Sequence, residues 1–257
     1  MGGHANGSFC WVDLAAHDYD GAVGFYGTIF GWTHEPAPPG GPRYGMFKDG
    51  DAVVAGIGEM APEMKAVMPS VWNSYVQTAD ARATVAKAKE LGGEVVFDAY
   101  ETPGGTGTLA FLKDPTGAVF ALWQPAAHTS PAKLGEPFAC CWQELATRDP
   151  EAAQAFYGAL FGWTFTPGSS PEVVYFISNG DQMIGHFIRM NEQWGDLPPA
   201  WTPYFAVKDT DATCEAVKAA GGTVPVEGTD IPAGRFAVIG DVQKAHSYVI
   251  QLAHPPG

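Results

Sequence analysis

In this chain of 257 residues, a tryptophan followed two residues later by a carboxylate occurs at equivalent places in two repeated segments. The first pair is Trp11 and Asp13, and the second pair, 131 positions further on, is Trp142 and Glu144. Side chains two residues apart on a strand lie on the same face of the sheet. Each pair would therefore place a broad apolar ring beside an acidic group, which could orient a flat ligand or exchange a proton with it.

Other aromatic residues and histidines extend this candidate site. His246 precedes Tyr248 by two residues, and His186 stands where the first repeat has Ile57, which would make a site one-sided. We predict that acid–base chemistry, if present, uses Asp13, Glu144 and His246. The predicted ligand-binding residues are Trp11, Trp72, Trp123, Trp142, Trp201, Tyr248 and His186.

A plainer interpretation exists for each of these residues. The tryptophans could pack in the core between sheet and helix. Asp13 and Glu144 could be solvated residues at a rim, or could pair with Arg43 or Arg235. His246 could be an ordinary strand histidine.

Other catalytic patterns are absent from the sequence. The segment Pro103–Gly107 lacks the lysine of a phosphate-binding loop, and there is no GxSxG nucleophile motif. The four cysteines show no CxxC or zinc-binding spacing. A metal site made by Asp13, Glu144 and His246 would need these residues to converge from both halves, which the spacing does not require. We therefore predict no metal and no cofactor.

The composition limits the partners. The net charge is −14, from 28 acidic and 14 basic residues, and such a surface repels nucleic acid and anionic membranes. No apolar run approaches the roughly 20 residues that span a bilayer. The N-terminal residues lack a basic start and an apolar stretch, so they do not read as a signal peptide. With unpaired cysteines, the expected location is the cytoplasm.

The elements that carry these residues are repeated. Phe25-Tyr26-Gly27 and Phe30-Gly31-Trp32 recur as Phe156-Tyr157-Gly158 and Phe161-Gly162-Trp163, again offset by 131 positions. Self-similarity at a fixed period indicates duplicated structure. We predict a first domain at 1–125, a linker at 126–137 and a second domain at 138–257. One half can supply the partner of the other, so the chain is expected to be a monomer or a homodimer.

Each half contains the same pattern twice. In the first half, a strand at 9–14 leads into a helix that begins after Asp18 and ends at Gly31, and strands follow near 43–48 and 52–59. A second unit has a strand at 72–78, an alanine-rich helix at 81–91, and strands at 94–98, 108–112 and 118–124. The sequence therefore predicts an α+β fold with four βαβββ-like units.

This arrangement resembles the vicinal oxygen chelate superfamily, which includes glyoxalases, bleomycin-resistance proteins, fosfomycin-resistance enzymes and extradiol dioxygenases. The βαβββ units, the Phe-Tyr and Phe-Gly-Trp end of the first helix, and Asp114-Pro115-Thr116-Gly117 carry the resemblance. More narrowly, the chain looks like two-domain glyoxalase-like proteins of actinobacteria, some labelled hydroxylases. The resemblance implies two tandem domains, each with a cup-shaped mixed sheet flanked by helices.

The family's metal-binding positions are altered here. Metal-dependent members carry histidine, glutamine or glutamate at three strand positions in the cup. Carried over to this chain, these positions fall on Trp11, Trp72 and Ala121, and on Trp142, Trp201 and Tyr248. None of these side chains suits a divalent cation. The expected function is metal-free binding of an aromatic natural product or antibiotic in an aromatic cup. The alternatives are a cofactor-free isomerase, cyclase or accessory hydroxylase, a metal-dependent lyase, and a structural interaction protein.

Overall fold

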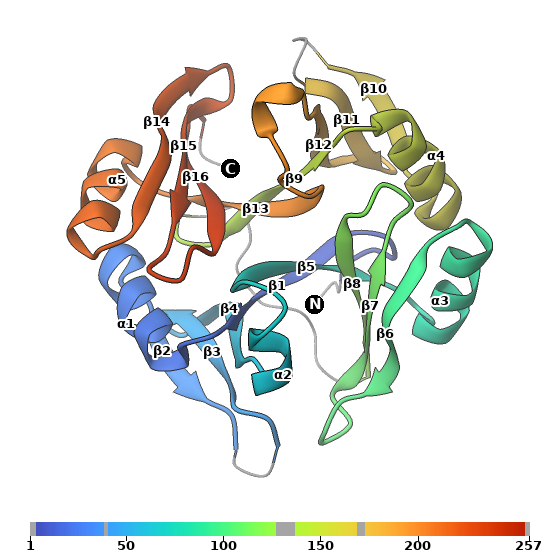
Figure 1. Cartoon of the computed structure of the whole chain (residues 1–257), viewed down its shortest axis with the longest axis horizontal. Helices are drawn as coiled ribbons and strands as arrows, with labels where there is room; N and C mark the ends of the chain where they lie inside the picture. Colours follow the sequence, from blue (N-terminus) through green and yellow to red (C-terminus); the bar gives the residue numbers. More distant parts are fainter. Residues whose placement is uncertain (1–3, 39–40, 127–136, 169–172, 255–257) are drawn as a thin grey trace. The chain divides into compact units, whose positions relative to one another are not determined.

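The computed structural model describes residues 4–38, 41–126, 137–168 and 173–254. Within these ranges the chain forms two eight-stranded sheets, one from each half, with helices beside them (Figure 1). The predicted α+β class and the repeated βαβββ units are confirmed. Residues 127–136 of the predicted linker lie outside the described residues, and the domain boundaries stay a prediction.

Each sheet mixes parallel and antiparallel pairs. The first sheet has the order β2-β3-β4-β1-β5-β8-β7-β6, and the second repeats it as β10-β11-β12-β9-β13-β16-β15-β14. The strands of the first sheet are β1 (Phe9–Ala16), β2 (Thr33–Pro36), β3 (Tyr44–Asp49), β4 (Ala52–Glu59), β5 (Val71–Gln77), β6 (Glu94–Glu101), β7 (Gly107–Lys113) and β8 (Val119–Pro125). Those of the second are β9 (Cys140–Thr147), β10 (Thr164–Pro167), β11 (Val173–Asn179), β12 (Gln182–Arg189), β13 (Ala200–Ala206), β14 (Thr223–Ile231), β15 (Gly234–Gly240) and β16 (His246–Leu252).

The long helices begin at aspartate caps, and the cap at Asp18 was predicted from the sequence. Asp18, Asp80, Asp149 and Asp209 each accept a hydrogen bond from a backbone N–H in the first turn. The helices are α1 (Tyr19–Phe30), α3 (Ala81–Glu90), α4 (Pro150–Phe161) and α5 (Thr210–Ala219). Short helical turns at α2 (Pro62–Lys65) and η1 (Glu192–Trp194), and the short strands β2 and β10, were not predicted. None of the described helices is both long and apolar enough to cross a membrane.

The chain forms two compact units, and each unit takes one βαβββ module from each half. Unit 1 comprises Met1–Trp11, Asn73–Ser130 and Gln143–Thr202, and it contains α3 and α4. Unit 2 comprises Val12–Trp72, Pro131–Trp142 and Pro203–Gly257, and it contains α1 and α5. Helix α3 contacts α4 in unit 1, and α1 contacts α5 in unit 2. Each unit therefore has a core shared by both halves.

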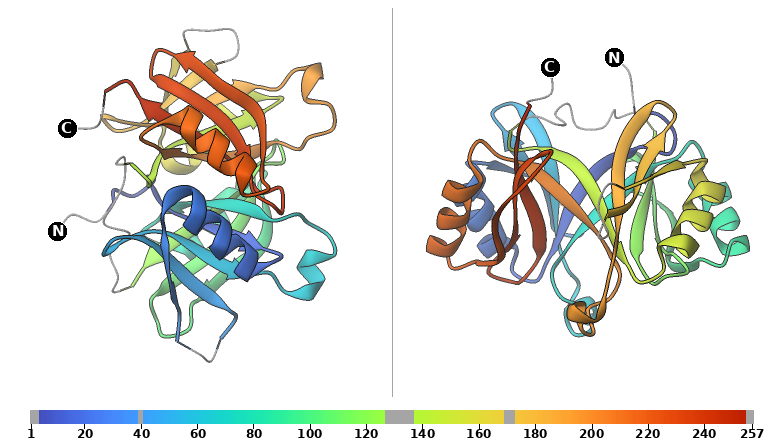
Figure 2. Two further views of the ribbon diagram at one scale, coloured as in Figure 1. Left: turned by 90° about the vertical axis from the view of Figure 1, so that its left-hand side faces the viewer. Right: turned by 90° about the horizontal axis from the view of Figure 1, so that it is seen from above.

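The strands alternate between two faces. In unit 2, helix α5 covers one face of β14, β15 and β16 (Figure 2), and Val249 packs there in the core. The neighbouring Tyr248 and Ile250 belong to a separate cluster on the opposite face. In unit 1, Phe120 packs on the side of α3 and α4, and Ala121 on the opposite side. We call the sheet face opposite the helix the distal face.

Candidate functional site

Two of the predicted ligand-binding tryptophans lie in the helix-side cores. Trp72 is 2% exposed and Trp201 is 4% exposed, in the cores of unit 2 and unit 1. Trp72 donates its Nε1–H to the Tyr26 hydroxyl at 3.0 Å, and Trp201 donates to the Tyr157 hydroxyl at 2.7 Å. The prediction that these two indoles line a ligand cup is therefore wrong. On β5, Trp72 shares the helix-side face with Val76, and the distal face is occupied by Tyr75.

Each of these tryptophans belongs to a buried hydrogen-bonded chain. The Tyr157 hydroxyl donates to the Asp114 carboxylate at 2.9 Å, and the Tyr26 hydroxyl donates to Asp241 at 3.4 Å. Burial raises the pKa of Tyr157 well above its usual value, and the Asp114 carboxylate raises this pKa further. Burial also raises the pKa of Asp114, against hydrogen bonds that favour its charged form. These chains fasten a helix of one half to a loop of the other half.

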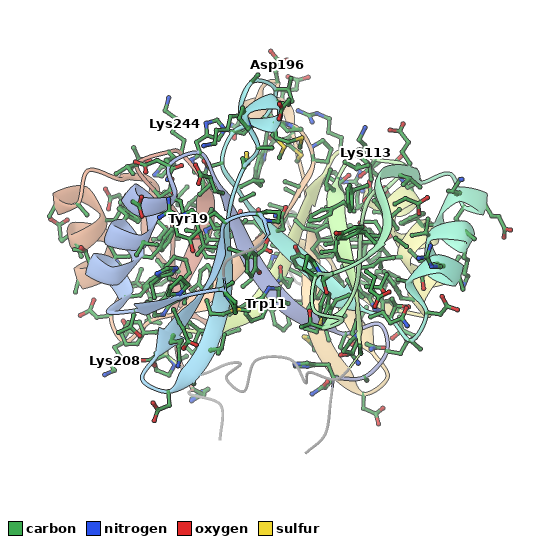
Figure 3. The ribbon with its side chains drawn as sticks, turned by 90° about the horizontal axis from the view of Figure 1, so that it is seen from below. Trp11, Tyr19, Lys113, Asp196, Lys208 and Lys244 are labelled. Atoms are coloured by element: carbon green, nitrogen blue, oxygen red, sulfur yellow. The ribbon has the colours of Figure 1, made fainter. Side chains whose placement is uncertain are left out.

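The distal face of unit 1 carries two rows of side chains across four strands. Strand register places directly paired residues side by side on one face. The first row is Tyr75, Ala121, Phe111 and Phe97, and the second is Gln77, Trp123, Leu109 and Tyr100. Trp11 of β1 packs against the same cluster (Figure 3 marks its position). The predicted residues Trp11 and Trp123 thus lie on one aromatic surface, and their role in binding stays a prediction.

Sequence alternation places Tyr100 on this face but does not place Phe97 there. Val95 and Ala99 pack toward the helix-side core, and Phe97 has the same parity as both. The register between β6 and β7 shifts twice, between Val95 and Phe97 and again between Phe97 and Tyr100. Each irregularity re-aims the following side chain. Both rings consequently stand on the distal face, 5.9 Å apart between centroids, and are 47% and 49% exposed.

The distal face of unit 2 is filled differently at the same register positions. The corresponding rows are Tyr204, Tyr248, Val238 and Val226, and Ala206, Ile250, Phe236 and Thr229. Tyr248 takes the place of Ala121, and its ring stacks on Tyr204 at 4.2 Å with an interplanar angle of 8°. The predicted residues Trp142 and Tyr248 both belong to this cluster. Its outermost positions are aliphatic or polar instead of aromatic.

The carboxylates predicted as acid–base groups are buried. Glu144 is 3% exposed, and its Oε2 lies 2.9 Å from Nε2 of His186 on β12. Glu144 and His186 are direct register partners in the parallel pairing of β9 with β12. His186 therefore corresponds to Gly56, the register partner of Asp13, and not to Ile57. A carboxylate beside an imidazole can pass a proton to or from a bound molecule.

The first half replaces this imidazole with a phenol. Asp13 is 7% exposed and accepts a hydrogen bond from the Tyr44 hydroxyl at 3.1 Å. A Cβ at Gly56 would collide with that hydroxyl. Glycine at this position is what allows Tyr44 to reach Asp13. The two halves thus hold different polar pairs at equivalent places.

The plainer interpretations of the carboxylates are wrong. Both carboxylates are buried, so neither is a solvated rim residue. Arg43 pairs with Asp20, and Arg235 pairs with Asp211 and Asp230.

The third predicted acid–base residue, His246, does not join either pair by a described contact. It is exposed at the start of β16. Partial burial of its ring lowers its pKa, and the Asp241 carboxylate opposes that shift.

The side chains at the positions carried over from metal-dependent members do not supply ligands for a divalent cation. The distal-face residues there include Ala121 and Tyr248, and Ala121 offers no donor atom. Among residues 4–38, 41–126, 137–168 and 173–254, no group of three histidine, cysteine, aspartate or glutamate side chains could hold a metal ion. Glu144 and His186 lie together, but two potential ligands are fewer than such a group of three. Cys141 on the distal face of unit 2 is not an activated ligand, because burial raises the pKa of its thiol.

The sequence and the fold both match known proteins. Residues 8–122 and 139–243 match the family model of the Glyoxalase/Bleomycin resistance protein/Dioxygenase superfamily. A Mycobacterium tuberculosis protein named "Putative glyoxylase CFP32" is 38% identical over 251 residues, which cover 95% of this chain and 94% of that protein. The "Anthracycline biosynthesis protein DnrV" of Streptomyces peucetius is 30% identical over 264 residues, which cover 96% and 94%.

Solved structures share the fold at low sequence identity. The Mn(II)-bound glyoxalase from Novosphingobium aromaticivorans aligns with a TM-score of 0.64 and 15% identity, over 98% of this chain and 86% of that chain. The 2,3-dioxygenase LapB from Pseudomonas sp. KL28 aligns with a TM-score of 0.67 and 12% identity, over 99% and 96%. With the family match across both halves, the chain belongs to the Glyoxalase/Bleomycin resistance protein/Dioxygenase superfamily.

Proposed function

We propose that this protein binds a planar aromatic small molecule, of the natural-product or antibiotic kind, without using a metal ion. The observation that carries the proposal is the aromatic distal face. In unit 1 it presents the half-buried Trp11, Phe111 and Trp123, none of which the helix-side core requires. Aromatic rings stack on a flat ligand over a large area, which contributes about 25 cal/mol per Å² of apolar surface removed from water.

Two further observations support this proposal. A relative covering almost the whole chain is named as an anthracycline biosynthesis protein, and anthracyclines are planar polycyclic molecules. The chain's net charge of −14 favours a ligand with a positive group. Under this proposal the partner is the small molecule, and the protein binds neither nucleic acid nor a membrane. It places the protein in the cytoplasm as a monomer or homodimer, without a cofactor.

The first test is binding of an anthracycline. Daunorubicin, which carries an amino sugar, and its sugar-free aglycone would be titrated by calorimetry and by quenching of tryptophan fluorescence. We expect saturable binding of one molecule per chain in the presence of a chelator. The Trp123→Phe variant should lose much of the quenching. The matched control is Trp194→Phe, because Trp194 belongs to neither distal-face cluster. Absence of saturable binding by any planar aromatic probe would contradict the proposal.

A second candidate function is an acid–base enzyme acting on a similar aromatic substrate. The observation that favours it is the buried pair of Glu144 and His186 at 2.9 Å, because a carboxylate that orients an imidazole is a common proton-transfer arrangement. The samples used for the binding test distinguish the two functions. An unchanged probe after long incubation supports binding alone. A product that disappears in Glu144→Gln and His186→Asn, while binding persists, supports catalysis.

A further inference from the structure

We propose that the first half alone binds the aromatic ligand, through the outer part of the distal face of unit 1 at Phe97 and Tyr100. This inference rests on the proposed function and specifies which of the two repeated surfaces performs it. At the equivalent positions of the second half, Val226 and Thr229 replace the two rings, and Tyr248 stacks on Tyr204.

The argument begins with what each surface exposes. Phe97 and Tyr100 are about half exposed, at 47% and 49%, and they stand on the distal face beside Phe111 and Leu109. Exposed rings that lie side by side form an apolar patch, and such patches often mark binding sites. The two rings meet edge to face, with an interplanar angle of 66°, so one ring can stack on a ligand while the other borders its rim.

The equivalent positions in the second half do not offer such rings. The register partners there are Val226 with Val238, and Thr229 with Phe236. Tyr204 and Tyr248 are large enough to stack on a ligand, but they stack on each other and are only 5% and 8% exposed. Their ring faces are therefore already used within the protein.

The chemistry around Phe97 and Tyr100 indicates the class of ligand. The phenol of Tyr100 is a polar tip at the border of an apolar surface, suited to a single hydrogen bond. Asp98 is exposed on the same strand, directly after Phe97, and the chain carries a net charge of −14. We therefore assign a planar, polycyclic aromatic cation to this surface.

A second copy of the chain is the competing occupant. An edge-to-edge pairing would use the backbone of β6, which is the last strand of the first sheet. Phe97 and Tyr100 instead point along the distal face, because their register partners Phe111 and Leu109 do so. Edge-to-edge pairing would therefore leave these two rings uncovered, and they are placed to contact a ligand that lies on the sheet face.

The test replaces the two exposed rings of the first half with the residues that the second half has at the same register positions. Phe97→Val with Tyr100→Thr gives the first half the residues that the second half already carries at these positions. The control variant, Val226→Ala with Thr229→Ala, trims the second half at the same register. Both pairs are exposed, so neither change should disturb the fold, which thermal unfolding would verify. The probes are daunorubicin and the planar cation proflavine, measured by calorimetry.

The first-half variant should bind both probes at least about tenfold more weakly, and the control should stay within about twofold of the original chain. If only the control loses affinity, the ligand lies in the second half: this inference is overturned and the proposed function stands. If neither variant changes the affinity, the inference is likewise overturned. No probe binding by the unaltered chain overturns both. Conversion of a dimer to a monomer by Phe97→Val with Tyr100→Thr, at unchanged probe affinity, would assign the surface to a second copy.

Discussion

The Tyr157 hydroxyl connects two buried groups, the Trp201 indole and the Asp114 carboxylate. It accepts a hydrogen bond from Trp201 and donates one to Asp114, which also accepts bonds from Thr116 and Ala118. A buried group that loses its partner costs more than the bond itself contributed.

Tyr157→Phe should therefore destabilise the protein. The indole N–H of Trp201 and one oxygen of Asp114 would each lose a partner, and we expect a loss of about 1–3 kcal/mol in the free energy of unfolding, measured with urea. Tyr175→Phe is the control, because Tyr175 is half-buried and its ring contacts are apolar. Tyr26→Phe should cost less, since the Tyr26 bond to Asp241 is longer, at 3.4 Å. Equal, small effects at all three tyrosines would show that the buried chain adds nothing.

Residue spacing predicted some members of the site and misplaced others. The two-residue separation of Trp11 from Asp13, and of Trp142 from Glu144, identified residues of the distal face and of the buried polar pairs. Trp72 and Trp201 were misplaced because the opening tryptophan of each second module was taken to face the same way as that of the first. Tyr75 and Tyr204 occupy the distal positions that were assigned to those tryptophans.

At the scale of elements, helix α1 contains two glycines whose surroundings differ. Gly24 is exposed, and a Cβ there would meet open space. Gly21 lies in the first turn, where a Cβ would collide with the Asp18 carboxylate that caps the helix. The same substitution should therefore have opposite results at two positions three residues apart.

Gly24→Ala should raise the free energy of unfolding by about 0.5–1 kcal/mol, because alanine restricts the unfolded chain more than glycine. Gly21→Ala should lower it by about 1 kcal/mol through displacement of the cap. Thermal and urea unfolding of the two variants would check both values. A stabilising Gly21→Ala would mean that the Asp18 cap is dispensable.

The caps and the glycine after α1 were predictable from sequence because they depend on local backbone chemistry. Asp18 and Gly31 act within one turn of their own helix. The position of Phe97 depends instead on the register shifts between β6 and β7. Such shifts are set by pairing with a distant strand, and alternation along β6 alone points to the wrong face.

At the scale of the whole molecule, the two halves share both cores. The core of unit 2 combines Tyr26 and Phe30 of the first half with Phe205 and Val249 of the second. The core of unit 1 combines Phe120 with Phe156 and Leu160. The repeat in the sequence revealed the duplication, but not that each compact unit is assembled from one module of each half.

Residues 1–125 expressed alone should consequently fail to fold as a stable monomer. Each of their two modules would lack the side chains that complete its core. We expect either an unfolded chain or a dimer in which two copies replace the missing half, and sedimentation with circular dichroism would distinguish these. Mixing with residues 138–257 should restore cooperative unfolding. A monomeric, cooperatively folded first half would contradict this description.

The difference between Ala121 and Tyr248 has a consequence for how such proteins change over time. A dimer of two identical single-half chains must carry every substitution twice, because its symmetry repeats each residue on both surfaces. Joining the halves in one polypeptide removes that symmetry. The tyrosines of one surface can then stack on each other while the other surface retains exposed rings. Mutations in a single gene can thus change the two surfaces independently.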